Sequence, residues 1–182
     1  MITSTNDAAE GGRSCAVFSD CTGYRFWLSR QWDESKGMAN FLMLNPSTAD
    51  ENRLDPTLRR CMGFAKQWGY GSMVITNICA LRSTDPLALY RHTNPIGQDN
   101  LQFIRMAAAL SEIVVCGWGN HGAELRTPTL KKGLGGYVLN WLRETPGLAG
   151  NLSYLALTLA GEPGHPLYLR KDLTPQALIS QA

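Results

Sequence analysis

Residues 41–55 read FLMLNPSTADENRLD, an apolar run that ends abruptly at Asn45-Pro46 and then becomes polar and acidic. A short continuous apolar run is typical of a β-strand that is buried on both faces of a sheet. Residues 40–45 are therefore expected to form such a strand. Two interpretations of its last residue stay open. Asn45 either begins a turn before the proline, or presents its amide to a pocket at the end of the strand.

The rest of the chain alternates apolar runs with helical patterns. Further strands are predicted at residues 24–32, 72–81, 112–119 and 152–160, and helices at residues 55–69, 97–111 and 135–144. The first of these strands is expected to be half-buried or at an edge. This alternation indicates an α/β layered fold with a mostly parallel sheet.

The helix of residues 55–69 has a predicted start and a predicted buried face. Asp55 is a favourable N-cap, and Pro56 suits the first helical position. The apolar stripe at helical spacing includes Leu58 and Cys61.

The composition predicts one globular domain. The chain has 182 residues, of which 44% are hydrophobic and 18% are charged, and that length is enough to bury a core. Residues 1–14 are small and polar and are expected to be a flexible tail, which leaves residues 15–182 as a single α/β domain. A net charge of +2 does not by itself predict a nucleic-acid-binding protein.

The sequence also gives expectations for the cellular location of the protein and for its partners. No apolar run approaches the roughly 20 residues that span a bilayer, and the N-terminus has no signal-peptide pattern. The five cysteines have no C-x-x-C spacing, which favours a reduced, cytoplasmic protein. His92 and His121 have no metal-ligand spacing, so neither a metal nor another cofactor is expected. A monomer with no membrane partner is the working expectation.

Candidate site residues follow four of the predicted strands. In an open parallel sheet, ligands bind at the carboxyl ends of the strands. The residues expected to meet there are Asn45, Pro46, Ser47, Asn77, Gly117, Trp118, Asn120 and His165.

Each candidate also has a plainer interpretation. Asn77 could be a loop hydrogen-bonder, Gly117 could only end a strand, and a lone loop histidine such as His165 is more often inert than catalytic. A cationic set near the first strand end could bind phosphate or could be the solvated face of one helix. That set comprises Arg53, Arg59 and Arg60.

Six short blocks together resemble a bacterial family known as domain of unknown function 1643. They are MLNPSTAD, DPTLRRC, FAKQWGYG, TNICALRSTDP, CGWGNHG and GHPLYL, and they span roughly residues 24–171. This family brings no assigned activity.

The order of the blocks is also similar, more distantly, to the uracil-DNA glycosylase superfamily. That resemblance implies an α/β/α sandwich of three layers with a central parallel sheet. It implies that Asn45 positions the attacking water, that Asn77 reads the edge of the base and that His165 stabilises the leaving base. Trp118 is the candidate aromatic residue for stacking on the base.

The chain departs from the superfamily pattern at two places. Leu167-Tyr168 follows His165-Pro166 where a Ser-Pro pair is usual, and Ser47 replaces a glycine. No acidic water activator is in place, although Asp55 and Asp50 lie near the first motif.

The expected function is that of a DNA-base N-glycosylase, a DNA-repair hydrolase that hydrolyses or recognises a modified or damaged base. Its partner would be DNA or a nucleotide. Two alternatives remain: a non-catalytic nucleotide- or nucleic-acid-binding domain on the same fold, and an unrelated small-molecule α/β enzyme.

Overall fold

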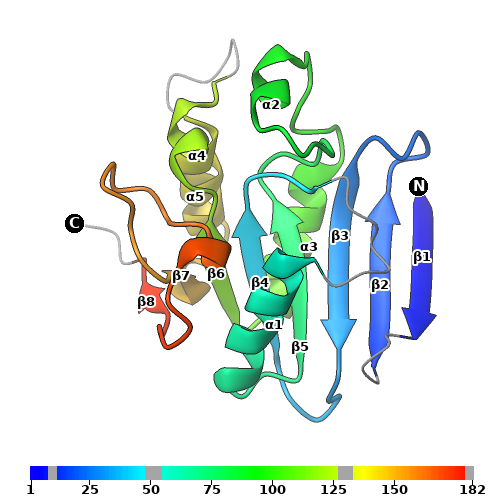
Figure 1. Ribbon diagram of the computed structural model, residues 1–182, viewed down its shortest axis with the longest axis vertical. Coiled ribbons are helices and arrows are strands. Elements are labelled where there is room, and N and C mark those ends of the chain that lie inside the picture. Colours follow the sequence, from blue (N-terminus) through cyan, green and yellow to red (C-terminus); the bar gives the residue numbers. More distant parts are fainter. Residues whose placement is uncertain (8–11, 48–54, 127–132, 179–182) are drawn as a thin grey trace.

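A computed structural model describes residues 1–7, 12–47, 55–126 and 133–178 (Figure 1). The strands within these ranges are β1 Ile2–Asp7, β2 Arg13–Phe18, β3 Arg25–Gln31, β4 Met38–Met43, β5 Ser72–Asn77, β6 Ile113–Gly117, β7 Leu152–Tyr154 and β8 Gln176–Ala177. The α-helices are α1 Pro56–Gln67, α2 Leu87–Arg91, α3 Asn100–Leu110, α4 Asn120–Glu124 and α5 Leu134–Glu144. Two single-turn 3-10 helices complete the elements, η1 Ala149–Asn151 and η2 Pro166–Tyr168.

The strands form one mixed sheet in the order β1-β2-β3-β5-β4-β6-β7-β8. The neighbours β5, β4, β6 and β7 run parallel, whereas the other four strand pairings are antiparallel. The α/β class is confirmed, but the prediction of a mostly parallel sheet is wrong. The physical reason is that β1, β2 and β3 follow one another as antiparallel hairpins, which need only short connections.

The N-terminal residues differ most from expectation. Residues 1–14 were expected to be a flexible tail, yet Ile2–Asp7 form β1 and pair antiparallel with β2 from Ile2↔Phe18 to Asp7↔Arg13. The sequence ITSTND is mostly polar, but its isoleucine and threonines are β-branched residues that favour strands. Backbone pairing with β2 therefore outweighs the polar composition. β3, in turn, lies inside the sheet between β2 and β5 rather than at an edge.

Residues 41–43 of β4 are all apolar because both faces of this strand are buried. Phe41 and Met43 belong to a core cluster with the buried side of α1, whereas Leu42 belongs to a second cluster with α3 and α5. Successive side chains of a strand point to opposite faces. Helices therefore cover both faces of the parallel strands, with α1 in front and α3 and α5 behind in Figure 1.

Helix α1 begins where the sequence predicted. Asp55 is its N-cap, and its Oδ1 accepts a hydrogen bond from the Leu58 N–H at 2.7 Å, while Pro56 occupies the first turn. A side-chain N-cap of this kind contributes about 1 kcal/mol. The helix buries the predicted face, including Leu58 and Cys61.

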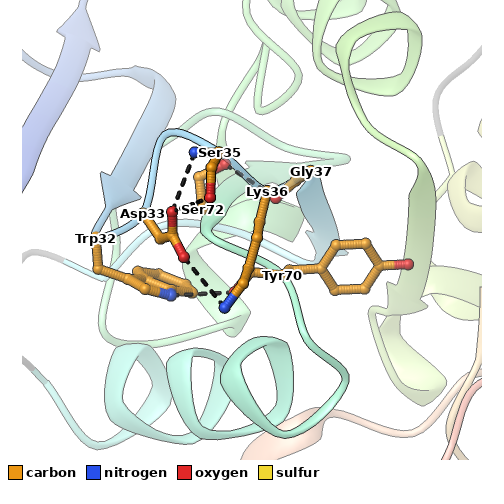
Figure 2. Close-up of polar contacts among 7 residues, drawn as sticks. All are labelled: Trp32, Asp33, Ser35, Lys36, Gly37, Tyr70 and Ser72. Carbon is orange, nitrogen blue, oxygen red and sulfur yellow. Dashed lines mark hydrogen bonds and ion pairs between the residues drawn. The ribbon is translucent and has the colours of Figure 1, made fainter.

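A polar cluster lies at the connection between β3 and β4 (Figure 2). Because this connection leads into the start of β4, it lies at the opposite end of that strand from Asn45. The Trp32 Nε1–H donates to the Tyr70 carbonyl at 3.0 Å. Asp33 accepts from the Ser35 N–H and hydroxyl at 3.0 and 2.6 Å, and Lys36 Nζ lies 3.1 Å from its other oxygen. These hydrogen bonds, led by that of Ser35, lower the pKa of Asp33 to about 2. The Gly71 and Ser72 N–H groups donate to the Gly37 carbonyl at 3.0 and 3.3 Å, and these hydrogen bonds join the starts of β4 and β5.

Candidate functional site

A small pocket lies at the carboxyl ends of β4 and β5, beside the first turn of α1 and the η2 turn. Its volume is about 240 Å³, below the roughly 300–1,000 Å³ of sites that hold drug-sized ligands. Its polar and charged lining residues include Arg25, Asn45, Ser47, Asp55, Asn77 and His165. The parallel arrangement of β4, β5, β6 and β7 thus brings four of the predicted candidates, Asn45, Ser47, Asn77 and His165, into one pocket.

The amide of Asn45 is held in one orientation. Its Nδ2 donates to the carbonyl oxygens of Pro46 and Ser83, at 3.1 and 2.8 Å. The Ser83 N–H also donates to the Pro46 carbonyl at 2.9 Å, which ties the two loops together. Because both amide hydrogens have backbone acceptors, the Oδ1 atom remains as the hydrogen-bond acceptor of this side chain. Asn45 can therefore orient a water molecule or a ligand N–H group.

Asn77 is the most unusual residue of the pocket. Its side chain is only 2% exposed, and its Nδ2 is shielded from solvent without a hydrogen-bond partner among the described residues. A buried unpaired donor costs about 1–3 kcal/mol and calls for an explanation in a native structure. Asn77 lines the pocket, and rotation about χ2 of an asparagine is soft, so a turn of this amide is the movement that a ligand acceptor would require.

His165 is oriented as the N-cap of η2. Its Nδ1 accepts a hydrogen bond from the Leu167 N–H at 3.3 Å, and this assigns the proton of the neutral ring to Nε2. Burial lowers the pKa of His165, and the nearby Asp55 carboxylate opposes that change more weakly. The ring is therefore neutral at pH 7 and carries one N–H donor.

Asp55 connects the start of α1 to the pocket. Its Oδ1 caps the helix, and its Oδ2 accepts a long hydrogen bond of 3.4 Å from the Ser47 hydroxyl. Sequence reasoning treated Asp55 mainly as a helix cap, and the structure adds that it lines the pocket. The neighbouring Asp50 and the predicted phosphate ligand Arg53 lie outside the described residues.

Two further lining residues were missed from the sequence. Arg25 in β3 lines the pocket although it is only 7% exposed. Tyr168 lies at the rim, is 82% exposed, and has its ring centroid 5.6 Å from that of His165. The sequence signals for these two residues were an arginine inside an apolar strand and a tyrosine directly after His165-Pro166-Leu167. Only the fold brings both of them close to Asn45.

Other candidates from the sequence are not among the residues that line this pocket. Trp118 is buried in the core, and its Nε1–H donates to Glu162 at 2.7 Å. Asn120 accepts a hydrogen bond from the Thr158 hydroxyl at 2.6 Å. Because Trp118 is 2% exposed, its indole has no free face on which a base could stack.

Gly117 and Pro46 contribute through the backbone and not through a side chain in the pocket. A Cβ atom at Gly117 would lie 2.8 Å from Pro166 Cδ and 3.3 Å from the Gly164 carbonyl oxygen. The missing side chain therefore lets the loop that carries His165 approach β6. Pro46 is buried, and its carbonyl accepts from the Asn45 amide.

Arg59 and Arg60 lie on a different side of α1. They line a neighbouring groove together with Lys171, and Leu167 forms part of the wall of both this groove and the pocket. Arg59 and Arg60 therefore lie next to the pocket that contains Asn45 and Asn77, but they are not among its lining residues.

The geometry defines a mixed α/β protein with a small polar pocket at the carboxyl ends of its parallel strands. A family model described as "Protein of unknown function (DUF1643)" matches residues 25–167. The chain belongs to this family, as the sequence blocks predicted. No curated protein and no solved structure matches the chain.

None of the helices among the described residues combines the length and the apolar character that a membrane crossing requires. Within the same residues, no group of three or more histidine, cysteine, aspartate or glutamate side chains is arranged to hold a metal ion. Of the cysteines, Cys61, Cys79 and Cys116 are buried and free, and burial raises the pKa of each thiol.

Proposed function

We propose that the pocket receives one base extruded from DNA, and that the protein either recognises a modified or damaged base or hydrolyses its N-glycosidic bond. The observation that carries this proposal is the buried, unpaired Nδ2 of Asn77 in the same pocket as Asn45 and His165. A carbonyl oxygen on a bound base would supply the missing acceptor. The amide would then no longer bear the penalty of an unmade hydrogen bond.

The charges of the pocket also favour a base over a phosphate group. Arg25 and Asp55 carry opposite charges, and the lowered pKa of His165 keeps this ring neutral. The charged and titratable groups among the described lining residues thus sum to about zero. A neutral, planar ligand with several hydrogen-bonding atoms suits such a site better than an anion does, and the small volume suits a single ring system.

In the proposed reaction, the oxygen of a water molecule attacks the anomeric carbon while the carbon–nitrogen bond breaks. Asn45 Oδ1 accepts a hydrogen bond from this water, and the Asp55 carboxylate takes up its proton. The electron pair of the broken bond leaves with the base, where the His165 Nε2–H donates a hydrogen bond to the developing negative charge. Extrusion costs a few kcal/mol, which stacking on the exposed Tyr168 ring would partly offset.

The fold supports a more distant relation to the uracil-DNA glycosylase superfamily. Helices on both faces of the sheet are what an α/β/α sandwich requires, and the pocket lies where open parallel sheets bind ligands. The antiparallel strands β1, β2 and β3 would be an addition to the parallel part. The order of the sequence motifs, from LMLNPS to GHPLYL, supports the same relation.

Base release from labelled oligonucleotides tests the activity. The panel would contain uracil, hydroxymethyluracil and hypoxanthine, with wild type compared with Asn45→Ala and His165→Ala. Loss of one preorganised group that acts on the transition state lowers a rate by about 10²–10³, and we expect a loss of this size in both variants. Asn120→Ala is the matched control, because this asparagine is not among the lining residues of the pocket.

The proposal fails if the wild-type protein neither binds nor cleaves any substrate of the panel. It also fails if Asn120→Ala reduces release as much as Asn45→Ala does, because the effect would then not depend on the pocket. Circular dichroism of each variant checks that the fold is retained.

A non-catalytic binding domain is the second candidate, and one observation favours it. The Asp55 carboxylate already accepts hydrogen bonds from the Leu58 N–H and the Ser47 hydroxyl, so both of its oxygens are engaged within the fold. In that case the wild-type protein would bind an oligonucleotide containing the base without releasing it. Asn45→Ala would then weaken binding and change no rate.

A further inference from the structure

The groove beside the pocket is strongly basic. Its volume is about 580 Å³, and its walls include Arg59 and Arg60 of α1 and Lys171 from the C-terminal segment. The described residues that line it include no carboxylate. The adjacent Asp172 does not neutralise Lys171, because both of its oxygens accept hydrogen bonds from Arg170.

The groove and the pocket share a wall and a helix. Leu167 of η2 lines both, and the first turns of α1 contribute to both sides. Thr57 and Leu58 face the pocket, whereas Pro56 and Arg59 face the groove. A ligand whose neutral part fills the pocket can therefore extend its anionic part over Leu167 into the groove.

We infer that this groove holds the sugar–phosphate backbone next to the base in the pocket, so that the ligand is a nucleic-acid strand rather than a free base or nucleoside. This inference rests on the proposed function. Its basis is the division of charge, since the pocket suits a neutral ring and the groove suits a run of phosphates. Lysine and arginine that contact phosphates release bound counterions from the strand.

Counterion release makes the inference measurable. For single strands, the slope of log K against log salt concentration changes by about 0.7 for each phosphate neutralised. Replacing Arg60 and Lys171 with glutamine removes two cations and should reduce the slope by about 1.4. The difference in affinity between wild type and the double variant should then shrink about 7-fold between about 50 and 200 mM NaCl.

The experiment measures fluorescence anisotropy of a short labelled single strand containing the best base from the panel, over a NaCl series. Arg105→Gln is the matched control, because Arg105 is exposed on α3, which covers the other face of the sheet (Figure 1). We expect a wild-type slope in the control and the reduced slope in the double variant. Thermal unfolding checks that the double variant is folded.

Three other outcomes would each overturn the groove inference. If wild type binds the strand and the double variant has an unchanged slope, the groove inference is overturned and the proposed function stands. If wild type binds no strand, the proposed function fails and the inference fails with it. If poly-glutamate competes as well as the oligonucleotide does, the groove serves acidic protein segments, which also overturns the inference.

Discussion

Replacing Asn77 with leucine is expected to stabilise the protein while it weakens ligand binding. The two side chains have the same branched shape, so the substitution changes polarity more than volume. Asn77 is 2% exposed, and its Nδ2 has no partner in the described part of the chain. Removing a buried unpaired donor should recover about 1–3 kcal/mol of the free energy of unfolding. For a chain of this size, that gain raises Tm by roughly 2–12 °C.

Asn100 provides the comparison. It is fully buried, and its Nδ2 donates to the carbonyls of Asn77 and Ile78 at 2.8 and 3.3 Å, whereas its own Oδ1 has no partner among the described residues. Asn100→Leu should still lower the free energy of unfolding, by about 1–3 kcal/mol, because two backbone carbonyls lose their donor while only one unpaired acceptor is removed. Urea denaturation of both variants and wild type measures the difference.

The result for Asn77→Leu tests whether this buried amide is retained for a ligand. A stability gain together with loss of oligonucleotide binding means that this amide is retained for a ligand at a cost in stability. A loss of stability as large as that of Asn100→Leu would refute the argument, because Asn77 would then have a structural partner. Affinity measured on the same samples separates the two effects.

Three further predictions concern other parts of the molecule. The pKa of Asp33 is about 2 in the folded protein and near 3.8 ordinarily, so its contribution to stability is present above about pH 4 and is lost as the pH falls toward 2. In acid titrations, the free energy of unfolding of Asp33→Asn should therefore change less with pH over this window than that of wild type. Gly117→Ala should destabilise the protein by about 1–3 kcal/mol, because the new Cβ would lie 2.8 Å from Pro166 Cδ, and unchanged urea unfolding and oligonucleotide affinity would contradict this. Cys21 is exposed and its pKa is lowered, chiefly by the Ser19 hydroxyl, so mass spectrometry after brief alkylation should find it modified first. Modification of the three buried cysteines at an equal rate in the native protein would show that the core opens readily.

The sequence determined those features that depend on neighbouring residues. The apolar run of residues 40–45 predicted a strand buried on both faces, and β4 has Phe41 on one side and Leu42 on the other. Asp55 and Pro56 predicted the start of α1 because helix capping depends on residues within one turn. Asn45 and His165 were expected at one edge of the sheet, and the consecutive parallel strands bring them there.

The tertiary structure alone decided which residues surround the pocket and how the remaining strands pair. Polar β1 becomes a strand because β2 supplies its hydrogen-bond partners, and Arg25 reaches the pocket because β3 pairs with β5. Trp118 follows a strand that ends at the correct edge, yet the packing of α5 against it keeps the ring in the core. Periodicity and capping are local properties, whereas strand order and burial depend on contacts between distant segments. This is why the sequence indicated the edge of the sheet that carries the site, and only the folded chain determined the residues that form it.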